Sequence, residues 1–383
     1  MAEPFKNRLD AALVRQAARH LERAWPAFER RRFERLATQG LEALELKARA
    51  MHIADALDAT LPADFGLAAS VVEASLGAPL PVEGDTAPPA ATEADDGIRG
   101  WFCWPLGEFV ARRGIDHPQR ALQALHALTQ RWSAEWAIRP FIVRHPQPTF
   151  VTLARWTRDP SAHVRRLVSE GSRPRLPWGL QLKALIADPS PTLPLLEALL
   201  DDPSPYVRRS VANHLNDIAK DHPAVVERWL AEHLPGASVE RLALLRHASR
   251  TLIKHGHAGV MAHWGVGKPL RGHATLQVSP AVVELGAAIE LQVELVSTAR
   301  RAQRLQVDYV VHHVKADGRL TPKVFKGWSV ELGAGDTRTL RKRHALRVVT
   351  VRRYHAGQHR VGLRVNGRDV AHADFDLRLP AAA

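Results

Sequence analysis

The sequence predicts two domains of different class, an all-α repeat solenoid followed by an all-β sandwich. Three observations support this prediction. A phrase that begins Asp-Pro-Ser occurs twice, 43 residues apart. The spacing of the apolar residues changes from helical to alternating near Gly272. The chain has 383 residues, which is enough to bury two separate cores.

The helical domain is predicted to span residues 1–271. Apolar residues follow helical spacing in residues 1–76 and again from Trp101 to about Gly265. Between these segments, residues 77–98 form a stretch that is rich in Pro and Ala, with five carboxylates and no lysine or arginine. This composition is typical of a flexible acidic loop.

The repeated phrase lies in the middle of the helical domain. Its two copies are residues 159–166 and 202–209, and Asp188-Pro189-Ser190 repeats the opening once more. The Asp-Pro-Ser opening predicts a turn and a helix cap. A repeat of roughly 40–47 residues built from helix pairs is the period of HEAT and armadillo solenoids, so we predict a HEAT-like solenoid.

Each copy of the phrase predicts a helix with one apolar and one polar face. The apolar stripe of the second copy consists of Val207, Val211, Leu215 and Ile218. Arg209, Asn213 and Asp217 share another face, and Arg166 and Glu170 take the places of Arg209 and Asn213 in the first copy. Alternating arginine and carboxylate is most simply a solvated ion-pair face, and a functional surface along the stacked repeats is the alternative.

Residues 272–383 are predicted to form a β-sandwich. Apolar and polar residues alternate in three segments, residues 275–278, 289–295 and 305–310, and Asp317-Gly318 and Asn366-Gly367 are hairpin-turn signals. About seven short strands indicate an immunoglobulin-like sandwich that lacks the inter-sheet disulfide. From Arg271 onward the chain has 19 lysines and arginines against 10 aspartates and glutamates. This excess predicts an accessory domain that binds a polyanion, and charge protection of an edge strand is the alternative.

The net charge and the cysteine content of the chain limit which binding partners and which cellular compartment are expected. The formal net charge is +13 and the isoelectric point is about 10.5, which favours nucleic acid or an acidic membrane surface as partner. Cys103 is the sole cysteine, so an intramolecular disulfide is excluded and a reducing cytoplasm is expected. The sequence has no signal peptide and no apolar run of about 18 residues, so we predict no membrane association. It also has no HExxH motif and no Cys/His ladder, and we predict neither a metal nor a cofactor.

A basic stripe is predicted near the end of the helical domain. Arg246, Arg250 and Lys254 lie at i, i+4 and i+8, so they would share one face of a continuous helix. Neighbouring cations on a helix repel one another by a few tenths of a kcal/mol per pair, and a phosphate backbone would remove this cost. We therefore predict that the stripe contacts nucleic acid, with a solvated face as the alternative.

Two phrases in the helical domain resemble the AlkC branch of the AlkC/AlkD DNA alkylation repair glycosylases. They are VRRLVSEGSRPRLPW at residues 164–178 and VRRSVANHLNDIAKDHP at residues 207–223, with support from residues 44–49 and 132–136. Some AlkC-type proteins carry a C-terminal immunoglobulin-like domain, as predicted here. The resemblance covers roughly residues 5–270.

The resemblance implies a monofunctional DNA glycosylase of base excision repair. Such an enzyme hydrolyses the N-glycosidic bond of cationic alkylated bases in duplex DNA, here mainly 3-methyladenine with 3-methylcytosine as a further substrate, and leaves an abasic site. Members of this family are thought to act without full base flipping. No Schiff-base lysine stands out near the candidate carboxylates in the sequence, so we expect no lyase step. We further expect a monomer that works on the nucleoid in the cytoplasm.

The resemblance also implies the site residues. Glu170 and Asp217 would lie at the cleavage centre, with Glu135 beside them. Negative charge there suits the reaction, because loss of the base builds oxocarbenium character on the sugar. The alternative for Glu135 is a structural carboxylate held by the neighbouring tryptophans. The predicted DNA contacts are Trp178, Arg166, Arg209, Arg246, Arg250 and Lys254.

A different role is possible for Trp178, and two different functions are possible for the whole protein. Trp178 follows Pro177 and could instead anchor the next helix in the core. The protein could be a non-catalytic HEAT-repeat scaffold that binds nucleic acid or another protein, or it could recognise damage without excising it. Carboxylates discriminate among these hypotheses, because Glu170 and Asp217 on a DNA-facing surface would repel phosphate and would not help a simple binding protein.

Overall fold

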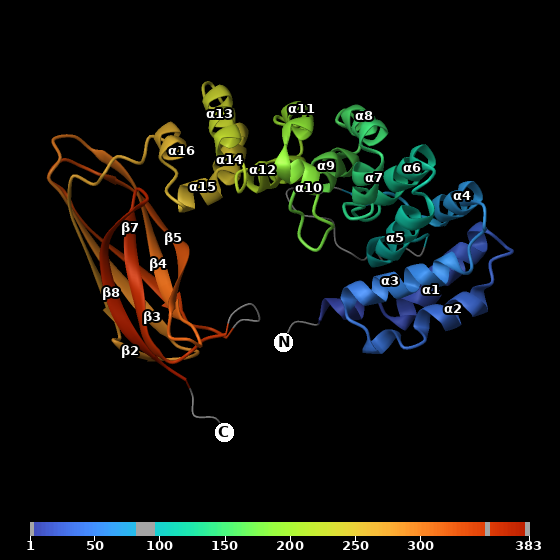
Figure 1. The fold of residues 1–383 in the computed structure, drawn as a ribbon, viewed down its shortest axis with the longest axis horizontal. Helices are drawn as coiled ribbons and strands as arrows, with labels where there is room; N and C mark the ends of the chain where they lie inside the picture. Colours follow the sequence, from blue (N-terminus) through green and yellow to red (C-terminus); the bar gives the residue numbers. More distant parts are fainter. Residues whose placement is uncertain (1–3, 82–95, 349–352, 380–383) are drawn as a thin grey trace. The chain divides into compact units, whose positions relative to one another are not determined.

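A helical region is followed by a β region in the computed structural model, as the sequence predicts (Figure 1). The structure describes residues 4–81, 96–348 and 353–379. The greater part of the predicted acidic loop at 77–98 therefore lies outside the described residues. None of the described helices is both long and apolar enough to cross a membrane.

The chain forms two compact units. The first comprises Met1–His222 with Ala237–Ala248, and the second comprises Pro223–Gly236 with Ser249–Ala383. Helix gives way to strand at Gly272, where β1 begins. The second unit nevertheless also contains three helices, so the division into compact units does not coincide with the change of secondary structure.

Helices make up the described part of the first unit. Its α-helices are α1 (Ala11–Ala24), α2 (Arg30–Thr38), α3 (Leu46–Asp58), α4 (Phe65–Ser75), α5 (Cys103–Arg113), α6 (Pro118–Thr129), α7 (Arg139–Arg144), α8 (Pro146–Trp156), α9 (Ala162–Gly171), α10 (Lys183–Ala187), α11 (Leu193–Ala198), α12 (Pro205–Ile218) and α14 (Val239–Ala248). Its 3-10 helices are η1 (Phe5–Arg8), η2 (Leu41–Ala43), η3 (Gly100–Phe102) and η4 (Ser190–Thr192).

The two copies of the repeated phrase start α9 and α12 in the same way. The carboxylate of Asp159 accepts a hydrogen bond from the backbone N–H of Ser161, and Asp202 does the same for Ser204, both at 2.8 Å. These are the turns that the sequence predicts. The serines occupy the N-cap positions as predicted, but neither serine side chain makes a capping hydrogen bond.

The two arginines that end each phrase have different surroundings. In each copy the first arginine, Arg165 or Arg208, folds back and donates to the carbonyl oxygens of its own Asp-Pro turn. Arg165 also pairs with Asp202 of the next copy, with Nε–Oδ2 at 2.6 Å. The first arginine therefore stabilises the repeat, whereas the second, Arg166 or Arg209, lies on another part of the helix surface.

The second unit contains α13 (Pro223–His233), α15 (Arg250–Lys254) and α16 (Ala258–His263), followed by two sheets. The described strands are β1 (Gly272–Ser279), β2 (Val282–Glu284), β3 (Ala288–Ser297), β4 (Gln303–Val314), β5 (Leu320–Leu332), β6 (Thr337–Ala345), β7 (Gly357–Val365) and β8 (Arg368–Arg378). One sheet has the order β1-β3-β6 and the other β2-β8-β7-β4-β5. All strand pairs are antiparallel except β2 with β8.

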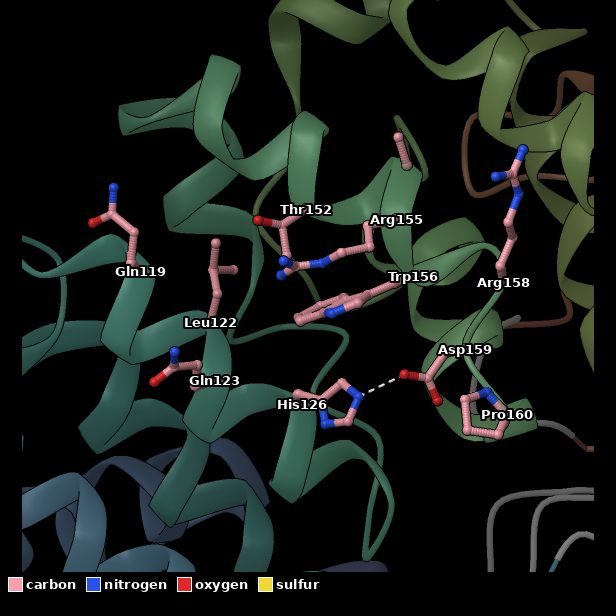
Figure 2. Close-up of a pocket in the computed structure, with 11 residues that line it drawn as sticks. Gln119, Leu122, Gln123, His126, Thr152, Arg155, Trp156, Arg158, Asp159 and Pro160 are labelled. Carbon is pink, nitrogen blue, oxygen red and sulfur yellow. Dashed lines mark hydrogen bonds and ion pairs between the residues drawn. The ribbon is translucent and has the colours of Figure 1, made fainter.

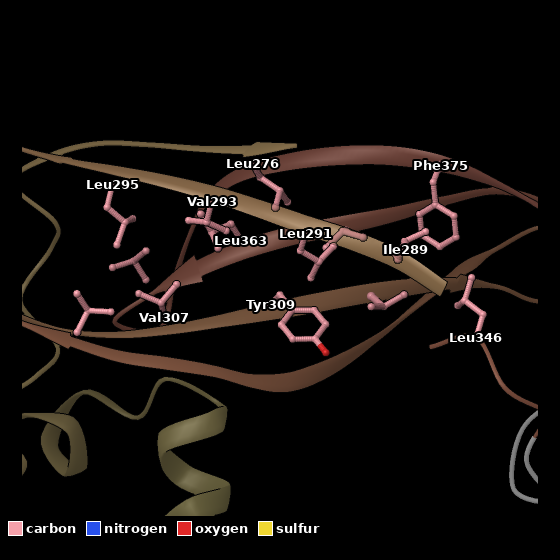
Figure 3. Close-up of a cluster of buried hydrophobic side chains, with 14 of the residues drawn as sticks. Leu276, Ile289, Leu291, Val293, Leu295, Val307, Tyr309, Leu346, Leu363 and Phe375 are labelled. Atoms are coloured by element: carbon pink, nitrogen blue, oxygen red, sulfur yellow. The ribbon is translucent and has the colours of Figure 1, made fainter. Parts of the chain in front are cut away.

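Alternating apolar residues build the core between the sheets, as the sequence pattern predicts. On β3, Ile289, Leu291, Val293 and Leu295 are fully buried and pack against residues of β4, β7 and β8 (Figure 3). Asp317-Gly318 joins β4 to β5 and Asn366-Gly367 joins β7 to β8, so both predicted hairpin turns are confirmed. Asn366 and Gly367 both have positive φ, at 48° and 79°, as the tight two-residue turn requires.

Candidate active site

The three predicted carboxylates come from three segments of the first unit. Glu135 lies in the turns before α7, Glu170 in the last turn of α9 and Asp217 in the last turn of α12. Helices α9 and α12 pack against each other, because the repeat places their apolar stripes side by side. This packing brings the ends of both helices together.

Two arginines connect the three carboxylates. Arg166 Nη1 donates to Glu135 Oε2 at 2.9 Å, and its Nη2 lies 3.7 Å from Glu170 Oε1. Arg173 Nη1 donates to Glu170 Oε1 at 2.6 Å, and its Nε donates to Asp217 Oδ2 at 2.8 Å. The structure therefore brings Glu135, Glu170 and Asp217 into one continuous network, which we call the carboxylate–arginine chain: Glu135, Arg166, Glu170, Arg173 and Asp217.

Glu170 is held as an anion inside the protein. Its exposed fraction is 5%, and its second oxygen, Oε2, accepts a hydrogen bond from Ser210 Oγ at 2.6 Å. Burial raises the pKa of Glu170, but the charges of Arg166 and Arg173 and these hydrogen bonds lower it overall. Glu170 is therefore ionised at neutral pH. Because its side chain is buried, the expectation of a solvated ion-pair face is wrong.

Asp217 is still more deeply buried, with an exposed fraction of 1%. Arg173 bonds its Oδ2, and Lys220 Nζ donates to its Oδ1 at 2.8 Å. The side chain of Lys220 is 43% exposed. One lysine therefore lies beside a candidate carboxylate as its ion-pair partner, and the absence of a Schiff-base lysine stays a prediction. Lys220 follows the end of α12 three residues after Asp217, a spacing that would have indicated this pair.

A fully buried arginine fixes the segment that carries Arg173. Arg139 donates through Nε to the carbonyl oxygen of Leu180 at 2.5 Å and through Nη1 to those of Gly171 and Arg173, both at 2.8 Å. Burial and the nearby Arg173 lower the pKa of Arg139 to about 10, so the guanidinium stays charged at neutral pH. Arg139 thus joins the start and the end of the segment 171–180 from inside.

Trp178 lies on that segment and is exposed. Its exposed fraction is 64%, so the alternative of a core anchor is wrong. Its φ of 62° is uncommon for a residue other than glycine, and the surrounding structure must hold it. The indole of Trp136 supports the segment: its ring stacks 6.3 Å from that of Trp178, and its Nε1 donates to the carbonyl of Pro177. The exposed position of Trp178 is compatible with a contact to DNA, and that contact stays a prediction.

A pocket of about 190 Å³ adjoins the carboxylate–arginine chain. Glu135 and Arg166 line it, together with the aromatic rings of Trp132, Trp136 and Tyr206. The guanidinium of Arg166 lies over the Tyr206 ring, 4.9 Å from its centroid. The pocket is therefore mostly aromatic, with one carboxylate and one stacked cation.

The other predicted basic residues do not all join this site. Arg209 is exposed on α12. Arg246 belongs to α14, but that helix ends at Ala248 and Arg250 begins a new helix, α15. Arg246, Arg250 and Lys254 thus do not share one continuous helix face, because the chain leaves helical geometry at the buried Ser249. Their contact with nucleic acid stays a prediction without this geometric support.

Sequence reasoning missed Arg173, Ser210 and Lys220, which bond the carboxylates directly, and also Arg139 and Tyr206, which contact the segment of Arg173 and the guanidinium of Arg166. Arg173 follows Glu170 at i+3, so helical spacing could have indicated it. Arg139 has no such signal, because its partners are backbone carbonyl oxygens more than 30 residues away in the sequence.

A second and larger pocket lies away from this chain of residues. It has a volume of about 820 Å³ and is lined by residues of α6, of α8 and of the turn after α8 (Figure 2). His126 Nε2 bonds Asp159 Oδ2 at 2.7 Å on its wall. None of the predicted site residues lines it. Among the described residues, no group of three or more His, Cys, Asp or Glu side chains could hold a metal.

Two family profiles match the chain. Residues 127–252 match the family described as "DNA alkylation repair enzyme", and residues 272–379 match "Uncharacterised protein YhaZ, C-terminal Ig-like domain". The first match contains all five members of the carboxylate–arginine chain. The second supports the immunoglobulin-like assignment of the sandwich.

Two similar proteins match over nearly the whole length. The protein YhaZ of Bacillus subtilis is 33% identical over 376 residues, which cover 97% of this chain and 99% of YhaZ. A solved structure of the alkylpurine DNA glycosylase AlkC of Pseudomonas fluorescens, bound to DNA containing an abasic site analogue, is 34% identical. It superposes with a TM-score of 0.89 over 98% of this chain and 100% of AlkC.

Proposed function

We propose that this chain, which belongs to the AlkC-type DNA alkylation repair glycosylase family with a C-terminal immunoglobulin-like domain, excises cationic alkylated bases from duplex DNA. The preferred substrate would be 3-methyladenine, with 3-methylcytosine accepted as well. The product would be an abasic site and a free base. The observation that carries the proposal is the carboxylate–arginine chain, in which the buried Glu170 is kept ionised by Arg166 and Arg173.

The chemistry follows from the charge of the substrate. A water oxygen bonds to C1′ of the deoxyribose, and the bond from C1′ to the base nitrogen breaks. The bonding electron pair leaves with the cationic base, which becomes neutral, and the water gives up a proton. Because the leaving group is already good, the enzyme has to stabilise the oxocarbenium-like sugar more than it has to protonate the base.

The carboxylates of Glu170 and Asp217 would provide that stabilisation. Their positions are fixed before the substrate arrives, because Arg173 bonds both of them and Ser210 and Lys220 bond their remaining oxygens. Preorganised charge of this kind needs no rearrangement during the reaction. Glu135, connected through Arg166, would extend the same negative region toward the aromatic pocket.

The direct test is release of the methylated base. Duplex DNA treated with a methylating agent is incubated with the full-length protein, and the released bases are separated and quantified. We expect free 3-methyladenine and an equal amount of abasic sites, without strand breaks, because we propose no lyase step for Lys220. Strand cleavage at the abasic site that depends on Lys220 would contradict the monofunctional assignment.

The second candidate function is a non-catalytic binding scaffold. One observation favours it, which is that Asp217 is 1% exposed and both of its oxygens already have partners. Buried ion pairs of this kind also occur with a purely structural role. Binding of alkylated duplex without any released base would support the scaffold and overturn the glycosylase proposal.

A further inference from the structure

We propose that the aromatic pocket beside the carboxylate–arginine chain receives the alkylated nucleobase as it leaves the sugar. This inference rests on the proposed function and adds to it a binding site for the leaving group. The ligand class is an amino-substituted purine or pyrimidine base without its sugar. Three features of the pocket support the inference: its aromatic walls, an open carboxylate oxygen and its size.

The walls of the pocket suit a flat heteroaromatic ring. Trp132 and Trp136 are both partly exposed, and each is backed by a second indole. Trp132 packs against Trp101 with the ring centroids 4.9 Å apart, and Trp136 packs against Trp104 at 4.3 Å. This backing holds the two rings in place before a ligand arrives. Stacking of a base on an aromatic side chain typically changes affinity by about tenfold or more and tolerates different bases.

One polar atom is positioned to select among bases. Glu135 Oε2 already accepts hydrogen bonds from Ser133 Oγ and Arg166 Nη1, whereas Glu135 Oε1 has no donor among the described residues. The positive charge of Arg166 is opposed by Glu135 and Glu170. Because Glu135 is one of the residues that line the pocket, a carboxylate acceptor is available to a bound base. Such an acceptor pairs with the exocyclic amine of an adenine-type or cytosine-type base and disfavours a base with a carbonyl at that position.

Size and position exclude larger ligands. The volume of about 190 Å³ corresponds to roughly six water molecules, at about 30 Å³ each. It lies below the range of about 300–1,000 Å³ that is usual for drug-sized ligands, so the pocket suits a single base better than a fully enclosed nucleotide. Glu135 and Arg166 belong both to the pocket and to the carboxylate–arginine chain, so a base released beside Glu170 would have only a short way to move.

The test measures binding of free bases to the full-length protein. Titration calorimetry is performed with 3-methyladenine, adenine and hypoxanthine. We expect the two amino bases to bind at one site and to compete with each other, and hypoxanthine to bind at least about tenfold more weakly. Trp132→Leu is expected to weaken binding of 3-methyladenine about tenfold. The matched control is Trp25→Leu, at a partly exposed tryptophan that does not line the pocket, and it should leave binding unchanged.

The outcomes separate this inference from the proposed function. If the wild-type protein excises 3-methyladenine but binds no free base at millimolar concentration, or if Trp132→Leu binds the base as tightly as the wild type, the pocket is not a base site. If free amino bases bind but no base is released from methylated DNA, the pocket stands and the glycosylase proposal fails. If Trp132→Leu does not fold, the binding of free bases to Glu135→Gln tests the inference instead. This variant should bind adenine and hypoxanthine equally well.

Discussion

At the scale of single residues, the site depends on charges that are buried together. Removing one partner from a buried ion pair leaves the other without compensation, and the usual cost is about 3–5 kcal/mol. Glu170 touches two arginines and Asp217 touches Arg173 and Lys220. Each carboxylate therefore has a structural effect as well as the proposed chemical one, and experiments must measure both.

We predict that Glu170→Gln and Asp217→Asn each lower base excision at least about tenfold, which corresponds to about 1.4 kcal/mol in barrier height. The single-turnover rate of 3-methyladenine release is measured at a temperature where circular dichroism shows folded protein. Asp221→Asn is the control, because Asp221 pairs with Arg175 nearby but is one-quarter exposed and lies outside the chain of buried charges. Full activity of the Glu170/Asp217 double variant would rule out the catalytic assignment.

Trp178 allows a cleaner separation of activity from stability. Because its side chain is 64% exposed, we predict that Trp178→Ala leaves the free energy of unfolding nearly unchanged while weakening excision. Trp104→Ala is the matched control, since Trp104 is 5% exposed and its loss should cost about 3–5 kcal/mol. The measurements are thermal unfolding and base release for both variants. A large loss of stability in Trp178→Ala would argue against a surface contact with DNA.

We expect the protonation of His214 to contribute to the pH dependence of the free energy of unfolding. Burial lowers the pKa of this histidine to about 4, against about 6.5 when unfolded. The unfolded state therefore binds the proton more readily than the folded state. The contribution of His214 to the free energy of unfolding is complete above about pH 6.5 and is lost as the pH falls toward 4. The total loss is roughly 3 kcal/mol. We predict that His214→Asn reduces this slope in the free energy of unfolding between pH 7 and pH 5. An unchanged slope would mean that other groups cause it.

At the scale of elements, the segment 171–180 links the fold to the site. It leaves α9 after Glu170, carries Arg173 and Trp178, and is held by Arg139. The backbone carbonyl oxygens of Gly171, Arg173 and Leu180 accept hydrogen bonds from the Arg139 side chain, and that of Pro177 accepts one from Trp136. A small displacement of this segment would move Arg173 away from both buried carboxylates and tilt Trp178.

We predict that Arg139→Lys lowers the single-turnover rate of excision at least about tenfold, because a lysine cannot reproduce the forked donors of the guanidinium. The control is Arg49→Lys. Arg49 is also buried and likewise donates to backbone carbonyl oxygens, four in its case, but in the N-terminal part of the unit. Both variants should lose stability, and only Arg139→Lys should lose activity while folded. Equal losses of activity in the two variants would reduce Arg139 to a general structural role.

At the scale of the whole molecule, the second unit contributes its own positive surface. β6 is an edge strand of the three-stranded sheet, and Arg338, Arg341 and Arg343 on it are exposed. Lys342 points elsewhere: its ammonium lies over the Trp328 ring, 5.6 Å from the centroid, and bonds the carbonyl oxygen of Lys326. Protection of the edge against pairing explains some of these charges, and contact with phosphates would explain their number.

We predict that Arg341→Ser with Arg343→Ser weakens duplex binding and makes its salt dependence shallower. Each lost phosphate contact changes the log–log slope by about 0.9. Binding is measured by salt titration with the full-length protein, and Lys342→Met serves as the control because that ammonium already contacts β5 of the other sheet. The single-turnover rate at saturating protein should change less than the affinity. An unchanged slope would favour edge protection.

The sequence by itself determined the order of the two fold classes, the hairpin turns and the choice of Glu135, Glu170 and Asp217. These features depend on local information. Alternation and helical spacing follow from how side chains project from strand and helix, and the Asp-Pro-Ser and Asn-Gly turns follow from the backbone preferences of those residues. The site residues followed from resemblance to a family, which conveys tertiary information indirectly.

Only the tertiary structure decided the environment of those residues. Burial changes Glu170 and Asp217 from a solvated face into a network held by Arg173, and it exposes Trp178, which the sequence left between core and surface. It also breaks the predicted Arg246–Lys254 stripe at Ser249. The physical reason is that burial and long-range partners depend on contacts between residues far apart in the chain. Arg139, which bonds carbonyl oxygens from Gly171 to Leu180, has no counterpart in any local pattern.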